Sequence, residues 1–182
     1  MAICALNDNL LRTTSCGYSL PQIVDLYLIN YEDLDGLPAT GNTGGEGEDE
    51  ISGVTLVTGA SVYHIEPARN SASFEDTLVV EDNGNKYRNA SITFNVSGQY
   101  SAKLHAALDG LSLGRYFVVV KTADGNYLGL GRIAPLEAET ATLAGGSDTN
   151  GIEITLSGNI AESPLTLTAQ AINDVTTKVK QD

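Results

Sequence analysis

The clearest hydrophobic pattern in the chain lies between Lys86 and Ile133. From Arg88 to Val96 apolar and polar residues alternate strictly, which is the period of a β-strand with one face in water. After Ser97-Gly98 the period becomes helical. The apolar stripe of this helical segment consists of Tyr100, Leu104, Ala107, Leu108 and Leu111. The pattern therefore predicts a strand followed by one helix at about 99–111, with Gly110 and Gly114 as its stops.

Two strands are predicted after this helix. Tyr116 to Val120 is apolar on both faces, which is typical of a buried central strand. Asp124-Gly125 then favours a tight hairpin into a strand from Tyr127 to Ile133. Because a helix this short cannot bury its apolar stripe alone, we expect it to lie on a sheet made by its neighbours.

Strand-like patterns recur through the rest of the chain. The segments are 22–31, 51–58, 61–66, 74–81, 137–143, 152–157 and 164–171. Residues 34–50 have no period and are glycine-rich and acidic, so we expect a long loop there. The polar end with Lys178 and Lys180 indicates a loose C-terminal tail.

Length and composition favour one all-β domain with a single helix. The chain has 182 residues, of which 42% are hydrophobic, enough for one real core but cramped for two domains. We expect an N-terminal arm at 1–21, a single domain at 22–173 and a C-terminal tail at 174–182. The first six residues are apolar, but a basic region and a long apolar core are lacking, so a secretion signal is not predicted.

The acidic net charge limits the kinds of partner that we expect for this protein. The net charge is −13, from 23 acidic and 10 basic residues. Such a surface should repel nucleic acid phosphate and anionic lipid, although simple solubility explains the charge equally well. No apolar run approaches the length of a membrane span, so no membrane partner is expected.

The residues give no support for a metal or cofactor. Cys4 and Cys16 are the only cysteines, too few for a disulfide framework. A zinc site would need two more ligands, and the spacing of His64 and His105 matches no metal pattern. We therefore predict idle or buried thiols, no metal and no cofactor.

Two short motifs resemble catalytic or binding signatures. Gly110 to Gly114 spells G-x-S-x-G, but the hydrolase elbow needs a strand, a turn, then a helix, with a later histidine. Here a helix precedes a strand and no histidine follows His105, so we expect Ser112 to be a turn residue. Gly129 to Ala134 fits G-x-G-x-x-A but opens no helix, so its glycines more plausibly allow a close approach. No catalytic residue is predicted.

The order of elements resembles a known family. The segment R-Y-F-V-V-V-K-T-A-D-G-N-Y-L-G-L-G at 115–131 and N-G-I-E-I-T-L-S-G at 150–158 are similar to tail-tube-type structural proteins of tailed bacteriophages. The closest likeness is to small virion proteins of phages of gut bacteria. It covers roughly Gln22 to Gly158, and its motifs are turns and strands rather than chemistry.

This resemblance implies a fold and an assembly. The fold would be two antiparallel sheets packed into a sandwich or barrel, with the helix on one side. Copies would close into rings, commonly six-fold, in the tail or connector of the virion, after assembly in the host cytoplasm. The ring would bind adjacent tail or connector proteins, and viral DNA would pass through without specific binding. The long loop becomes a candidate contact between subunits through Glu46, Glu48, Asp49 and Glu50.

An alternative is an extracellular β-sandwich module for binding or adhesion. Glycan binding would usually need an aromatic platform, and the chain has no Trp and eight scattered Tyr. A third and weaker alternative is a hydrolase built on Ser112.

Overall fold

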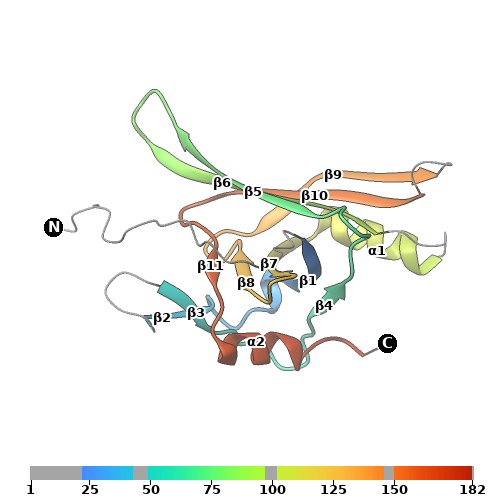
Figure 1. The fold of residues 1–182 in the computed structure, drawn as a ribbon, viewed down its shortest axis with the longest axis horizontal. Helices are drawn as coiled ribbons and strands as arrows, with labels where there is room; N and C mark the ends of the chain where they lie inside the picture. The colour runs from blue at the N-terminus through green and yellow to red at the C-terminus, as the bar shows by residue number, and fades with distance from the viewer. Residues whose placement is uncertain (1–21, 43–48, 97–101, 146–149, 182) are drawn as a thin grey trace, which may run out of the picture.

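The computed structural model describes residues 22–42, 49–96, 102–145 and 150–181. This part of the chain is mainly β, as predicted (Figure 1). Its strands are β1 (Ile23–Asn30), β2 (Ala39–Asn42), β3 (Asp49–Gly53), β4 (Tyr63–Ile65), β5 (Ser73–Val80), β6 (Lys86–Val96), β7 (Arg115–Thr122), β8 (Tyr127–Leu130), β9 (Leu136–Gly145), β10 (Asn150–Ile160) and β11 (Leu165–Thr166). Its helices are the 3-10 helix η1 (Tyr31–Asp33) and the α-helices α1 (Ala102–Leu113) and α2 (Ala169–Thr176).

Most strands belong to a single antiparallel sheet. This nine-stranded sheet has the order β11-β8-β7-β9-β10-β6-β5, and β1 pairs with both β7 and β4. Strands β2 and β3 form a separate two-stranded sheet. The predicted antiparallel arrangement is confirmed, but the large sheet does not close into a barrel.

The large sheet changes direction between β8 and β9. Both strands pair with the edge of β7 that faces away from β1, first through β8 and then through Leu136 and Glu137 of β9. Gly131 lies in the interruption with φ of 81°, where an added Cβ would be 3.1 Å from the carbonyl oxygen of Tyr116. Strands that switch layers through such a bend make the corners of orthogonally packed sheets. One sheet therefore folds over itself, instead of the two separate sheets that were expected.

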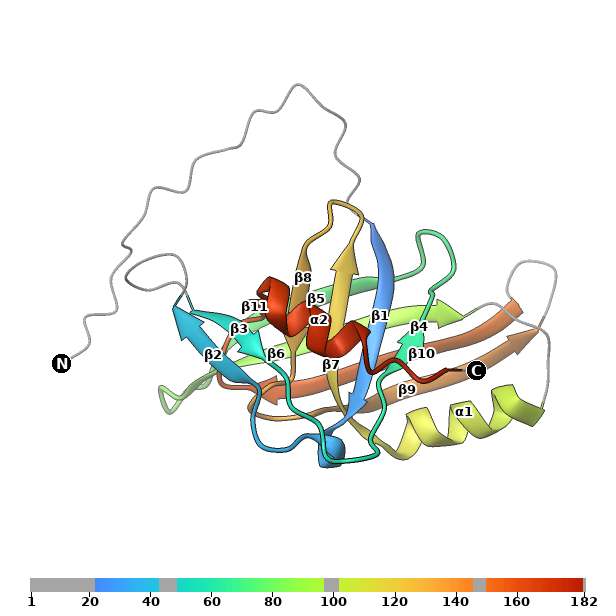
Figure 2. The same cartoon turned by 90° about the horizontal axis from the view of Figure 1, so that it is seen from below.

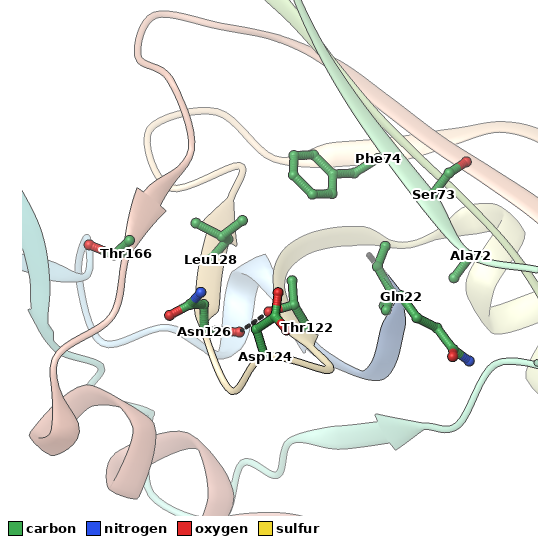
Figure 3. A pocket seen from close by; sticks show the side chains of 10 residues that line it. Gln22, Ala72, Ser73, Phe74, Thr122, Asp124, Asn126, Leu128 and Thr166 are labelled. Atoms are coloured by element: carbon green, nitrogen blue, oxygen red, sulfur yellow. Dashed lines mark hydrogen bonds between the residues drawn. The ribbon is translucent and has the colours of Figure 1, made fainter. Parts of the chain in front are cut away.

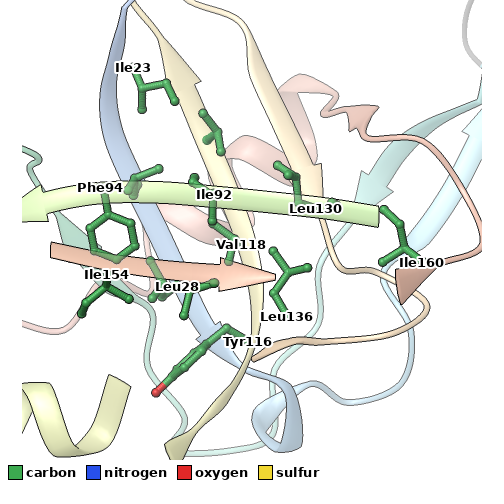
Figure 4. Packing of buried hydrophobic residues seen from close by; sticks show 14 of the residues in the cluster. Ile23, Leu28, Ile92, Phe94, Tyr116, Val118, Leu130, Leu136, Ile154 and Ile160 are labelled. Carbon is green, nitrogen blue, oxygen red and sulfur yellow. The ribbon is translucent and has the colours of Figure 1, made fainter. Parts of the chain in front are cut away.

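The fold-over produces two layers around a common core. The first layer is β5-β6-β10-β9, and its strands run across β1, β7 and β8 of the second layer (Figure 4). Ile92, Phe94 and Ile154 of the first layer are fully buried against the second. Leu28 and Val118 pack into the same cluster from the second layer. Burial of apolar surface between the layers is the main force that holds them together.

A second core lies on the other face of the second layer. Phe117 and Val119 of β7 point into it, and Ile51, Ala171 and Val175 cover them. β7 is therefore buried on both faces, as its continuous apolar run predicts. In Figures 1 and 2, α2 lies across this side of the molecule.

The strand predicted at 164–171 is wrong after Thr166. The Thr168 side chain accepts a hydrogen bond from the Ala171 amide at 3.4 Å, which caps α2. Ala171 and Val175 are one helical turn apart and both are buried. Capping and this short stripe outweigh the strand propensity of the segment.

The C-terminal end is packed rather than loose, so that prediction is wrong too. The Val62 amide donates to the carbonyl of Lys178, and the Lys180 amide donates to the carbonyl of Val62, each at 2.9 Å. Val179 packs against the second core. The division of the chain at 1–21, 22–173 and 174–182 remains a prediction.

The helix predicted at 99–111 is confirmed as α1, although its described part runs two residues further. It continues through Gly110, so this glycine is not the stop that was expected. Leu108 and Leu111 pack against the first core, and α1 runs alongside β9 (Figure 2). The Tyr116 hydroxyl donates to the carbonyl of Gly110 at 2.6 Å and ties the helix end to β7.

The segment 34–50 is not a plain loop. Strands β2 and β3 pair within it, with Thr40 opposite Ile51 and Asn42 opposite Asp49. The strand predicted at 51–58 begins earlier and ends at Gly53, and that at 61–66 shortens to β4. The glycines and threonines of this segment obscure the alternation that would have predicted a strand. β3 is held in place by Ile51, which is buried in the second core.

Candidate functional site

An extended candidate surface is the outer face of the first layer, which we call the polar face. It consists of the odd-numbered residues of β5 (73–79), β6 (87–95) and β10 (153–159), with Glu137, Thr140 and Thr142 of β9. These residues lie opposite one another across the strands and therefore share one side of the sheet. The alternating residues Ala90, Ile92 and Phe94 are fully buried on the other side.

Hydroxyl, amide and carboxylate groups cover most of the polar face. The Asn89 amide donates to Asn159 at 3.0 Å, and the hydroxyls of Thr93 and Thr155 are 2.9 Å apart. Its charged side chains are Glu75, Glu137 and Glu153, together with Glu139 beside a bulge in β9.

No basic side chain of the four strands faces this side. Lys86 and Arg88 are their only basic residues, and they lie opposite Val80 and Leu78 on the inner side of the sheet. The Arg88 Nε donates to Asp76 at 2.7 Å on the same side. The polar face is thus acidic and free of cations.

Both edge strands of the first layer lack a strand partner along their outer side among the described residues, although α1 runs alongside β9. β5 pairs only with β6 among the described residues. β9 pairs with β10 on one side, and beyond Glu137 no second strand of the described chain lies along its other side. Residues 139–143 of β9 are all exposed. Unpaired strand edges present amides and carbonyls that can pair with another chain.

An apolar groove opens between the layers beside β5 (Figure 3). It has a volume of about 540 Å³, and Phe74 of β5 faces Leu128 of β8 across it. Among the described residues that line it, only Asp124, at the β7–β8 turn, is charged. Further along the inner side of β5, Leu78 is 53% exposed and Val80 is 56% exposed. The groove therefore offers mainly apolar contacts.

A second pocket is built around an ion pair. Arg132 donates to Glu162 through two bonds of 2.6 Å each, and it also donates to the carbonyl of Pro38 at 3.2 Å. The hydrogen bond to Glu162 raises the pKa of Arg132. The Tyr31 hydroxyl donates to the carbonyl of Ile133 at 2.8 Å. Because these bonds join the corner to two loops, we assign Arg132 a structural role.

Two of the four predicted interface carboxylates lie at this pocket. Asp49 is exposed, and Glu50 accepts a hydrogen bond from the Thr166 hydroxyl at 3.1 Å. Glu46 and Glu48 lie outside the described residues, as do Cys4 and Cys16. The role of these carboxylates between subunits stays a prediction.

A third candidate site is a cluster of charged and polar side chains that connects β1 and β4. Nε2 of His64 is 2.9 Å from Oδ1 of Asp25, and Nζ of Lys121 donates to Oδ2 of Asp25 at 2.8 Å. Burial would raise the pKa of Asp25, but hydrogen bonds from Lys121 and His64 outweigh burial and hold this pKa below its ordinary value. Glu66 lies beside the pair. Sequence spacing missed the cluster, because only the pairing of β1 with β4 brings its residues together.

The two catalytic-looking motifs have structural roles. Ser112 lies inside α1 and donates to the carbonyl of Leu108 at 2.7 Å, so its prediction as a turn residue is wrong. The helix still precedes the strand, which is not the order of a nucleophile elbow. An added Cβ on Gly129 would be 2.5 Å from Ile51 Cδ1, so the predicted close approach at this glycine is confirmed.

Comparison with known proteins yields no assignment. No protein-family model matches the chain, and no curated protein or solved structure is detectably similar to it. Within the described residues, no helix is long and apolar enough to cross a membrane.

Proposed function

We propose that this protein is a non-enzymatic, ring-forming subunit of a phage tail tube, tail hub or head–tail connection. The observation that carries the proposal is the first layer, a four-stranded sheet with an acidic face, whose two edge strands have no outer strand partner among the described residues. The resemblance of residues 115–131 and 150–158 to tail-tube-type proteins supports the same conclusion.

The open edges supply a way to assemble. β5 and β9 lie at opposite sides of the layer, so β5 of one copy can pair with β9 of the next. Such a contact joins two different surfaces, and its repetition closes a ring when the rotation between copies divides a full turn. Backbone pairing between edges gives affinity without requiring particular side chains. The sheet of one subunit then continues into its neighbour.

The polar face supplies a surface past which DNA can move. Nucleic acid is held to proteins largely by contacts between phosphates and Lys or Arg. This face has Glu75, Glu137 and Glu153 and no basic side chain from its four strands. If the first layers line the ring, phosphates meet carboxylates and hydroxyls and do not adhere.

The apolar side chains on the inner side of β5 fit the same assembly. Leu78 and Val80 extend beyond the core and remain more than half exposed in a single copy. Contact with the neighbour beside β5 would cover them. A stable ring interface should bury on the order of 2,000 Å² or more in total.

Cysteine cross-linking tests the edge contact. In a background with Cys4→Ser and Cys16→Ser, Thr142→Cys of β9 is combined in turn with Ser73→Cys, Glu75→Cys and Thr77→Cys of β5. We expect oxidation of at least one pair to give a ladder of covalent oligomers that ends at a closed ring, visible by gel and negative-stain microscopy. The control pairs Thr142→Cys with Ser91→Cys, which lies on the same face but in the interior of the layer.

The outcomes separate the proposal from its alternative. A protein that stays monomeric by light scattering at high concentration, and that gives no ladder in any register, would disprove ring formation. Binding of that monomer to a glycan array would instead favour the extracellular adhesion module.

A further inference from the structure

The cluster on β1 and β4 contains three side chains of the types that bind metal ions. Asp25, His64 and Glu66 each offer a ligand atom, and these atoms all lie within 4.8 Å of one another. The cluster faces solvent, since the His64 side chain is 29% exposed and that of Asp25 is 17% exposed. An ion from solution can therefore reach it without any opening of the fold.

We propose that Asp25, His64 and Glu66 form a binding site for a divalent ion of the zinc class. One imidazole nitrogen and two carboxylate oxygens are a ligand set that zinc accepts, with water in the fourth position. The site is independent of ring formation, because it lies in the second layer, on the side of β1 that faces the second core.

The distances fit such an ion with small rotations of the side chains. Zinc lies about 2.0–2.2 Å from nitrogen and oxygen ligands, so two donors at a tetrahedral angle are about 3.4 Å apart. Nε2 of His64 and Oδ1 of Asp25 are 2.9 Å apart. One ligand atom from each of the three side chains lies within 4.8 Å of the others. When the site closes around an ion, Nε2 of His64 and Oδ1 of Asp25 move slightly apart and the Glu66 carboxylate moves closer to them.

Neighbouring side chains hold two of the ligands in place. Nζ of Lys121 donates to Oδ2 of Asp25 at 2.8 Å and fixes that oxygen, so Oδ1, which pairs with Nε2 of His64, is the oxygen that would turn to the ion. The His64 ring stacks on Tyr27 with centroids 5.0 Å apart and planes 17° apart. Partners that orient ligands in this way are typical of metal sites. With a neutral histidine, two carboxylates and one lysine leave a net negative charge that favours a cation.

The bound ion would tie an edge strand to the sheet. β4 is only three residues long and pairs with β1 alone among the described strands. Asp25 comes from β1, His64 from β4, and Glu66 directly follows β4. An ion that binds only the folded protein raises its stability by mass action, so zinc should raise the melting temperature.

Zinc titration of untagged full-length protein tests the site. Cys4→Ser and Cys16→Ser remove the thiols that would otherwise compete, and chelator treatment precedes calorimetry at neutral pH. We expect one zinc ion per chain and a rise in melting temperature. His64→Ala and Glu66→Gln should each weaken binding about tenfold or more and abolish the thermal shift.

Two comparisons make the test decisive. His105→Ala removes the other histidine of the chain and should leave both readouts unchanged. Glu66→Gln keeps the ion pairs of Asp25 with His64 and Lys121, so it separates a metal site from a simple salt-bridge cluster. Absence of zinc binding at millimolar concentration would overturn the proposal. So would unchanged affinity in the His64 and Glu66 variants, each checked for native folding by circular dichroism.

Discussion

The two layers of this protein differ in how many of their faces are exposed to water. The second layer, around β7, has apolar partners on both faces, and all five residues from Tyr116 to Val120 are buried. The first layer is buried on one face only, and it leaves a polar face and two edge strands without an outer strand partner in the described part of the chain. The doubly covered layer contributes most to the stability of the fold, whereas the half-covered layer is the one through which we propose assembly.

The largest expected effect comes from the core of the second layer. Phe117 of β7 is fully buried in the second core, on the side of the sheet that α2 covers. Phe117→Ala should lower the free energy of unfolding by about 3–5 kcal/mol, because it loses apolar burial and leaves a cavity. Thr140→Ala on the polar face is the control and should change it by less than about 0.5 kcal/mol. Urea unfolding measures both, and equal effects would contradict the comparison.

The next effect concerns the corner that joins the layers. Gly131→Ala places a Cβ 3.1 Å from the backbone oxygen of Tyr116 at a φ of 81°. Gly125→Ala has a similar φ of 86° but meets nothing within 4 Å. We expect about 1 kcal/mol for Gly125→Ala, from backbone strain alone, and about 2–3 kcal/mol for Gly131→Ala. Thermal unfolding measures the loss of stability in both variants, and the difference between the two losses is the steric contribution at Gly131. Equal losses would show that there is no such contribution.

A smaller effect is expected where α1 meets β7. Tyr116→Phe removes the hydrogen bond to Gly110 and should cost about 1 kcal/mol at neutral pH. Burial, and then the nearby Tyr63, raise the pKa of Tyr116 above its ordinary value of 10.0. The folded protein therefore holds this proton more tightly than the unfolded chain, and stability falls as the pH rises above 10.

The Tyr116 variant lacks that titration. Its deficit relative to the unmodified protein should therefore shrink between pH 10 and pH 11, measured by urea unfolding at each pH. A deficit that stays constant over this range would show that Tyr116 ionises equally well in both states.

Charge reversal on the polar face should have the smallest effect on stability but a large effect on the binding of DNA. Reversing Glu75, Glu137 and Glu153 to Lys should change the free energy of unfolding little, because surface charges contribute weakly. The same change creates phosphate contacts, so binding of duplex DNA should appear at low salt and fall steeply as salt rises. Fluorescence anisotropy measures it. Binding by the unmodified protein of similar strength would contradict a face past which DNA slides.

Sequence patterns predicted the parts of the fold that local physics controls. Strict alternation marks β6, the continuous apolar run marks β7, and Asp124-Gly125 marks the hairpin between β7 and β8. The period of α1 was equally clear. In each case neighbours in sequence supply enough of the signal, because strands and helices repeat over a few residues.

Other elements were predicted wrongly because their partners are distant in the chain. β3 is held by Ile51 in the second core, and α2 is held by Ala171 and Val175 there. Residues 169–176 do have a helical period, but the segment is only eight residues long. The end at Lys180 looks loose in sequence but bonds to Val62, more than a hundred residues earlier.

By itself the sequence determined the strand and helix segments with strong periods, the acidic charge and the wet face of the first layer. Only the tertiary structure decided which strands lie at the edges of that layer and which distant side chains meet. After the fold-over at Gly131, β5 and β9 have no outer strand partner among the described residues, and the pairing of β1 with β4 gathers Asp25, His64 and Glu66. The physical reason is that periodicity reports which side of an element is buried, whereas edges and ligand clusters depend on which elements meet.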